Sequence, residues 1–130
     1  MNRLAIGTAQ FGMDYGIGSS PGKVSISEVK KILEYAKLTN INVLDTASAY
    51  GKSEKTLGEL NVDEFKVVTK TRHFTNFKIN DDDLNALNHD FKKSLKDLKL
   101  DSVYGLLIHN ADDLMKPGAS KIIEFIQNLK

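Results

Sequence analysis

The sequence predicts an α/β fold in which a parallel sheet is built from repeated strand–loop–helix units. Two observations support this prediction: short apolar runs alternate with longer runs of helical periodicity, and the alternation occurs four times. Parallel neighbouring strands need a crossover connection, which is usually a helix, so the alternation favours right-handed crossover units. We find no low-complexity tract or internal boundary, and we treat residues 1–130 as one domain.

The first unit is expected to begin with a short strand at Leu4–Gly7. The glycine-rich segment 8–23 follows, and its glycines permit close approach of the backbone to a ligand. These glycines do not form a dinucleotide fingerprint, because no helix is expected directly after them. The periodic apolar run at 29–36 predicts the first helix, with Ser25 or Ser27 as its N-cap.

The next expected elements are the second strand, a short helix and the third strand. Ile41–Asp45 is expected to form the second strand, and the helix after it is expected to start near Ser53 and to end near Leu60. The third strand is expected at Phe65–Lys70, which is rich in β-branched residues.

The third helix is expected to be the longest. It starts at the acidic run Asp81–Asp83, where the helix dipole favours negative charge. Apolar residues then recur at spacings of three and four and predict one buried stripe, made of Leu84, Leu87, Phe91, Leu95 and Leu98. The continuous apolar run Val103–Ile108 is typical of a strand that is covered on both faces, and a fourth helix is expected to run from residue 122 to the end.

The composition excludes several classes of function. The chain has 18 Lys plus Arg against 17 Asp plus Glu, without a basic cluster, so no nucleic-acid partner is expected. It has no cysteine and its three histidines lie far apart in sequence, so no metal site is expected. His73 and His89 are interpreted as residues of a polar loop and of a helix surface. Without a signal peptide or a membrane-spanning stretch, a cytoplasmic location is expected.

Four ionisable side chains lie at or just beyond the ends of three successive expected strands. Asp45 ends the second strand and Tyr50 follows it, Lys70 ends the third, and His109 follows the fourth. The carboxyl ends of parallel strands lie on one face of a sheet, so these side chains are expected to converge there. Each residue alone has an ordinary interpretation, as a loop aromatic residue, a solvated lysine, a core histidine or a turn cap.

Together, the four side chains could transfer a proton. A lysine ammonium stabilises a neighbouring phenolate, and a carboxylate nearby keeps that lysine charged. Tyr50 could then act as a general acid toward a carbonyl oxygen that His109 orients. The carbonyl carbon would need a nucleophile, for which a hydride from a nicotinamide cofactor is the natural complement.

The segments LAIGTAQFG, DTASAYGKSE, VVTKT and LLIHN, in this order, resemble the aldo/keto reductases, which are NADPH-dependent carbonyl reductases on a (β/α)8 barrel. The resemblance covers the whole chain. It implies that Tyr50 is the proton donor, that Lys70 makes the phenol a stronger acid, and that Asp45 pairs with Lys70. It also implies that His109 orients the carbonyl. The opening GTAQFGMDYGIG further resembles a bacterial branch associated with sugar metabolism, which would suit a sugar-derived carbonyl substrate.

The resemblance also implies where a cofactor would bind. Gly7 and Thr8 match positions that approach NADPH through their backbone, and Asp45 is counted among the contacts to the nicotinamide ribose. The groups that hold the nicotinamide carboxamide and the ribose phosphate would come from strands five to eight.

A full barrel typically needs about 250 residues, and only four strand–helix units are expected here. We therefore expect the amino-terminal half of a reductase barrel, truncated and with little activity of its own. Its first and fourth strands would be open edges, through which the chain could associate with itself. The alternative is a non-catalytic regulatory or assembly subunit on a reductase scaffold.

Overall fold

A computed structural model describes residues 3–16 and 22–129 of the chain. It contains one four-stranded sheet of order β1-β2-β3-β4, in which every neighbouring pair is parallel. The predicted alternation of parallel strands with helices is therefore confirmed. In chain order the elements are β1 (Ile6–Gly7), α1 (Ala9–Gly12), α2 (Ile26–Leu38), β2 (Val43–Asp45), α3 (Ser53–Glu59), β3 (Lys66–Lys70), α4 (Asp81–Leu98), β4 (Gly105–Leu107), the 3-10 helix η1 (Ala111–Met115) and α5 (Ser120–Gln127).

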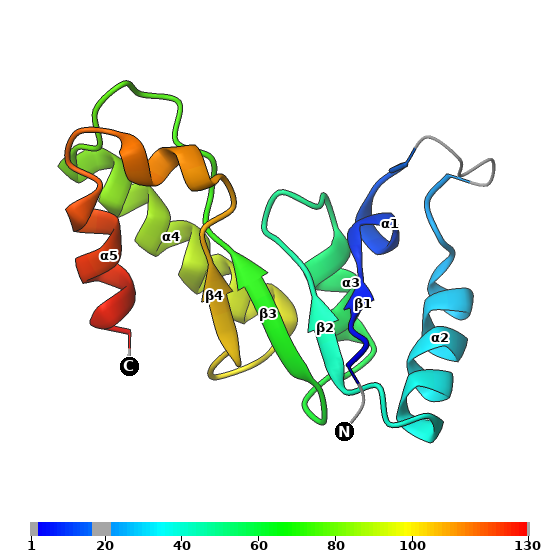
Figure 1. Ribbon diagram of the computed structural model, residues 1–130. Helices are drawn as coiled ribbons and strands as arrows, with labels where there is room; N and C mark the ends of the chain where they lie inside the picture. Colours follow the sequence, from blue (N-terminus) through cyan, green and yellow to red (C-terminus); the bar gives the residue numbers. More distant parts are fainter. Residues whose placement is uncertain (1–2, 17–21, 130) are drawn as a thin grey trace.

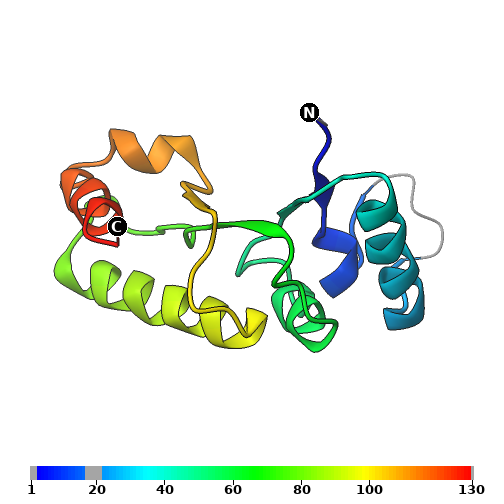
Figure 2. The same ribbon diagram turned by 90° about the horizontal axis from the view of Figure 1, so that it is seen from below.

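The sheet is covered on one face only. Helices α3 and α4 lie behind the strands in Figure 1, and Figure 2 shows α2, α3 and α4 on the same side of the sheet. On the other face, Leu107 of β4 is 50% exposed and Gly7 of β1 is also exposed. Strands β1 and β4 each have one neighbouring strand in the described structure, so the sheet has two free edges.

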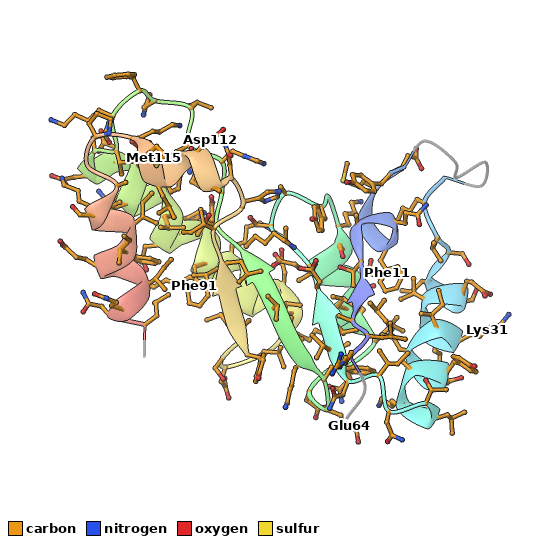
Figure 3. The ribbon with its side chains drawn as sticks, in the orientation of Figure 1. Phe11, Lys31, Glu64, Phe91, Asp112 and Met115 are labelled. Carbon is orange, nitrogen blue, oxygen red and sulfur yellow. The ribbon has the colours of Figure 1, made fainter. Side chains whose placement is uncertain are left out.

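Apolar residues between the sheet and its helices form the main core. Leu44 of β2, Val67 of β3 and Leu57 of α3 are at most 1% exposed. Figure 3 shows Phe11 of α1 among the side chains of this layer, whereas Lys31 of α2 points away from it. Side chains alternate between the two faces of a strand. Leu44 of β2, and Val67 and Thr69 of β3, are buried against the helices, so the strand-terminal residues Asp45 and Lys70 face the open side.

Helix α4 turns the predicted stripe toward the core, although Leu84, Phe91 and Leu95 are only partly buried. Leu87 and Leu98 are 1% exposed, and Leu84 packs against a second apolar cluster, which contains Phe74, Ile79, Leu87 and Ile122. The helix begins with a capping box, in which the Asn80 side chain accepts from the Asp83 N–H at 3.0 Å and Asp83 accepts from the Asn80 N–H at 3.1 Å. One carboxylate of the acidic run thus stabilises the helix start.

Each observed strand is shorter than the apolar run that predicted it. The four predicted strands, Leu4–Gly7, Ile41–Asp45, Phe65–Lys70 and Val103–Ile108, lose between one and three residues, because the parallel ladder pairs fewer positions. The prediction that the fourth strand is covered on both faces is wrong. Half-exposed Leu107 lies on the open face of the sheet, where the described structure has no second layer.

The helices differ from their predictions mainly near chain turns. Helix α1 opens directly after β1, contrary to the expectation, because four residues are too short for a helical period to be visible. Helix η1 was not predicted either, and α5 ends at Gln127 instead of at the last residue. Ser25 is the N-cap of α2 and accepts from the Glu28 N–H at 3.3 Å. Residues 17–21 of the predicted glycine-rich segment, which include Gly18 and Pro21, lie outside the described residues.

Candidate active site

The ends of β2 and β3 bring Asp45 and Lys70 into contact. The Lys70 ammonium donates to Asp45 Oδ1 and to the Thr46 carbonyl oxygen, the latter at 3.0 Å. The Lys70 side chain is 13% exposed and that of Asp45 is 43% exposed. An ion pair that is partly withdrawn from water is stronger than a fully exposed pair. The sequence analysis expected this pairing.

Tyr50 is held by the turn between β2 and α3. Its N–H donates to the Ala47 carbonyl at 3.0 Å, and its own carbonyl accepts from the Ser53 N–H at 3.0 Å. Gly51 follows with φ 58°, in the left-handed region that glycine adopts without strain. The Lys70 Nζ atom lies 5.1 Å from the centroid of the Tyr50 ring, within the range of a cation–π contact. The phenol and the ammonium therefore share one site.

Three buried hydroxyl groups fix this turn against β1. Thr8, Thr46 and Ser53 are each 0% exposed. The Ser53 hydroxyl donates to the Thr8 carbonyl at 2.8 Å, and its oxygen lies 2.9 Å from Thr8 Oγ1 and 3.2 Å from Thr46 Oγ1. Because buried polar groups need partners, these contacts explain why Thr and Ser occupy two positions of the DTASAYGKSE segment.

The backbone of Gly7 is more accessible to a ligand than that of Thr8. A Cβ atom added at Gly7 would meet nothing within 4 Å, so the backbone there is open to a ligand. Thr8 is fully buried, and its N–H already donates to the Asp45 carbonyl at 3.0 Å. Backbone contact with a cofactor stays a prediction for both residues, and the geometry favours Gly7.

His109 lies beside Tyr50, just past β4. The two ring centroids are 5.9 Å apart at an interplanar angle of 79°. Burial lowers the pKa of His109, and the charges of His73 and Lys70 lower it further, against smaller opposing effects of the Thr71 hydrogen bond and Asp45. The imidazole is therefore neutral near pH 7, so it can take part in a hydrogen bond to a substrate oxygen but is a poor proton source.

Two aromatic residues that the sequence analysis left outside the site lie against it. The His73 ring centroid is 4.1 Å from that of His109, although His73 was interpreted as a polar loop residue. The Tyr15 ring centroid is 6.4 Å from that of Tyr50. Both residues come from loops, whose path the apolar periodicity does not report. His89 is exposed on α4, as its interpretation expected.

A cavity of about 360 Å³ lies next to the site. Its lining includes Ser48, from the turn before Tyr50, together with His73, Arg72, Asp90, Lys93 and Glu54. Glu54 is 5% exposed, and its Oε1 accepts from the Thr69 hydroxyl at 2.6 Å. Burial raises the pKa of the Glu54 carboxyl, in the same direction as the charge of Asp97. Hydrogen bonds from Thr69 and Ser94 and the charge of Lys93 oppose this rise.

Glu54→Gln is expected to become more stable relative to the wild type as the pH rises. The folded state holds the Glu54 proton more tightly than the unfolded state does, so the wild-type free energy of unfolding falls as pH rises above about 4.5. Glutamine has no charge to desolvate, and its Oε1 can still accept from Thr69. Urea unfolding of both proteins between pH 4.5 and neutrality measures the difference. A difference that does not change with pH would contradict this assignment.

The residues that the structure describes contain no group of three or more His, Asp or Glu side chains placed to hold a metal ion. Over the same ranges, no helix combines the length and the apolar character that crossing a membrane requires.

Comparisons with known proteins find relatives across nearly the whole chain. The model of the aldo/keto reductase family matches residues 3–130. Two solved structures of candidate aldo-keto reductases from Pseudomonas aeruginosa share 26% and 25% identity with the chain, at TM-scores of 0.73 and 0.74. The matches cover 96% and 97% of this chain but 51% and 48% of those proteins.

Two other relatives extend this result. An aldo-keto reductase from Bacillus halodurans, solved in its holo form, is 19% identical with a TM-score of 0.66, and it supports the fold alone. That match covers 98% of this chain and 41% of the Bacillus protein. An oxidoreductase from Leptosphaeria maculans is 39% identical over 71 residues, which are 52% of this chain and 22% of that protein. The chain thus spans about half the length of the solved relatives, and its four units correspond to half of their (β/α)8 barrel, as predicted.

Proposed function

This chain belongs to the aldo/keto reductase family of oxidoreductases, and from this premise we propose that it carries the proton-transfer half of an NADPH-dependent carbonyl reductase site. The reaction is the reduction of a small aldehyde or ketone, for which a sugar-derived carbonyl compound is our first choice, to the alcohol. The observation that carries the proposal is the Lys70 ammonium, which Asp45 holds while it lies over the Tyr50 ring.

Each of the four residues has a distinct role in this proposal. Tyr50 donates its hydroxyl proton to the carbonyl oxygen of the substrate. The Lys70 ammonium stabilises the phenolate that Tyr50 leaves behind, and Asp45 keeps that ammonium in place. Neutral His109 hydrogen-bonds the substrate oxygen and orients it. These four side chains would supply the groups needed for proton transfer, but none of them can donate a hydride.

The residues present fit one edge of a nicotinamide cofactor. The open space at Gly7 leaves room for close approach to the backbone, and the Asp45 carboxylate, 43% exposed, remains accessible beside it. When bound, NADPH would supply the hydride that adds to the carbonyl carbon. The remaining contacts to the cofactor belong to the second half of a barrel, so the 130 residues alone are expected to show little turnover.

A second candidate function is a non-catalytic assembly subunit that pairs with a second copy of the chain. An apolar groove flanks each free edge of the sheet. The groove beside β1, about 550 Å³, includes Ile6 and Ile32, and the groove beside β4, about 300 Å³, includes Leu106 and Ile126. Two copies would supply eight strands, and β4 of each copy could pair with β1 of the other around a two-fold axis.

The isolated chain and a completed barrel together separate the two functions. The completed barrel is a fusion of this chain to the second half of the Pseudomonas aeruginosa protein that is 26% identical to it. We expect the fusion to oxidise NADPH in the presence of an aldehyde, and the isolated chain to do so at least about 100-fold more slowly.

Light scattering after size-exclusion chromatography gives the mass of the isolated chain, and an NADPH fluorescence titration measures its cofactor binding. A stable dimer of twice 14.5 kDa that binds no NADPH, with an inactive fusion, would favour the assembly subunit. Robust turnover by the isolated chain would contradict our view that the cofactor half of the site is missing.

A further inference from the structure

A second histidine lies directly against the histidine of the site. The rings of His73 and His109 have centroids 4.1 Å apart and are tilted by 44°, which is close to stacking contact. His73 is exposed, and His109 is only partly exposed, with its Nδ1 atom buried. The outer ring therefore covers part of the inner ring. Only the inner ring reaches Tyr50, at 5.9 Å between centroids.

The loop that carries His73 is tied to the segment that carries His109 on both sides of the pair. Before His73, the Thr71 N–H donates to the Leu107 carbonyl at 2.8 Å, and the Thr71 hydroxyl accepts from the His109 N–H at 3.1 Å. After His73, the Phe74 N–H donates to Asp113 Oδ2 at 3.4 Å.

The second tie also involves Lys116. Its ammonium donates to the Phe74 carbonyl and pairs with Asp113 at 2.8 Å. Figure 1 shows the loop between β3 and α4, which carries His73, running beside η1. Hydrogen bonds on both sides of His73 restrict the movement of this loop. The backbone around His73 therefore holds its ring against that of His109.

The structure around His109 disfavours a positive charge on its ring. An imidazolium would present an N–H at Nδ1, but this atom is buried and makes no hydrogen bond with the described residues, and the Thr71 backbone offsets the burial only in part. The charged groups that act on His109 are Lys70 on β3 and Asp45 on β2, whereas Arg72, Asp90, Lys93 and Glu54 line one cavity with His73. Asp113 and Lys116 bind the backbone of the next residue, Phe74. Arg72 is paired with Asp90 at 3.4 Å, and Asp45 is shared with Lys70.

We propose that His73 is a positioning residue of the reductase site, which stacks on His109, shields it from water and holds its ring toward Tyr50. The inference rests on the proposed function and adds to it a residue that the family motifs did not supply. A positive charge on His73 would also lower the pKa of His109 at this distance. Proton donation is then left to Tyr50, while His109 acts only through hydrogen bonding.

The test uses the three histidines of the full 130-residue chain as separate probes in a proton NMR pH titration. His73→Phe keeps an aromatic ring over His109 but removes the second charge, whereas His73→Ala removes both. His89→Gln changes an exposed histidine on α4 and is the matched control. Circular dichroism of each variant verifies that it is folded before it is titrated.

We expect the pKa of His109 to rise in His73→Phe, to rise further in His73→Ala, and to stay at the wild-type value in His89→Gln. In the barrel fusion, we expect His73→Ala to lower kcat by about 10-fold to 100-fold with little change in KM, because small misplacements of a catalytic group cost rates of this order. His73→Phe should recover most of that loss.

The outcomes separate this inference from the proposed function. An active fusion in which His73→Ala changes neither kcat nor the titration of His109 would overturn the role of His73 and leave the reductase proposal standing. A wild-type fusion that is folded by circular dichroism and binds NADPH, but is inactive, overturns the reductase proposal and with it the role of His73. A reduced kcat that phenylalanine does not restore, with an unchanged titration, would also overturn the role of His73.

Discussion

Tyr50→Phe in the barrel fusion is expected to lower aldehyde-dependent NADPH oxidation by about 10²–10⁴-fold, which is the usual contribution of a general acid. The substitution removes one hydroxyl group and keeps the ring over which the Lys70 ammonium lies, at 5.1 Å from the centroid. The loss should therefore appear in kcat, while NADPH binding, followed by fluorescence, stays near the wild-type value. The rate is measured from the loss of nicotinamide absorbance.

Tyr15→Phe is the matched control for this experiment. It removes the same group from a neighbouring ring, whose centroid lies 6.4 Å from that of Tyr50. We expect it to change turnover less than about tenfold, because it removes no group from the proton-transfer set. If Tyr50→Phe turns over as fast as the wild type, Tyr50 is not the proton donor. If only Tyr15→Phe is slow, the acid has been assigned to the wrong tyrosine.

Gly12→Ala is expected to destabilise the fold by about 3 kcal/mol, at the upper end of the cost of inserting one carbon into a packed interior. A Cβ atom at Gly12 would lie 2.0 Å from the Tyr50 carbonyl oxygen and 2.2 Å from the Ser53 nitrogen. Both are backbone atoms of the turn that holds Tyr50, so neither can rotate away as a flexible side chain could. Helix α1 would have to move off that turn. Urea unfolding followed by circular dichroism measures the loss of stability.

Gly7→Ala is the control, because a Cβ atom there would meet nothing within 4 Å. We expect a change in unfolding free energy below about 1 kcal/mol, in line with the ordinary difference between glycine and alanine. In the fusion the same substitution should weaken NADPH binding if the cofactor approaches this backbone. Equal destabilisation by both alanines would show that the packing of α1 on the Tyr50 turn does not limit stability.

The order of the four strands and of helices α2, α3, α4 and α5 followed from sequence, because the apolar pattern of each of these units is long enough to recognise. The stripe on α4 and the parallel sheet are both observed where the pattern predicted them. The ends of the strands and the short helices could not be predicted from sequence. Hydrogen bonding between neighbouring strands determines the strand ends, and the local path of the chain determines the short helices. Helix α1 has only four residues, and the burial of its Phe11 became visible only in the packed chain.

For the site, sequence by itself determined which ionisable residues stand at the carboxyl ends of the strands. Topology then brings Asp45, Tyr50, Lys70 and His109 to one edge, because all four strands are parallel. Only the tertiary structure decided that the Lys70 ammonium lies over the Tyr50 ring and that His73 covers His109. Apolar periodicity records which face of an element is buried, whereas contacts between loops arise only when distant segments pack together.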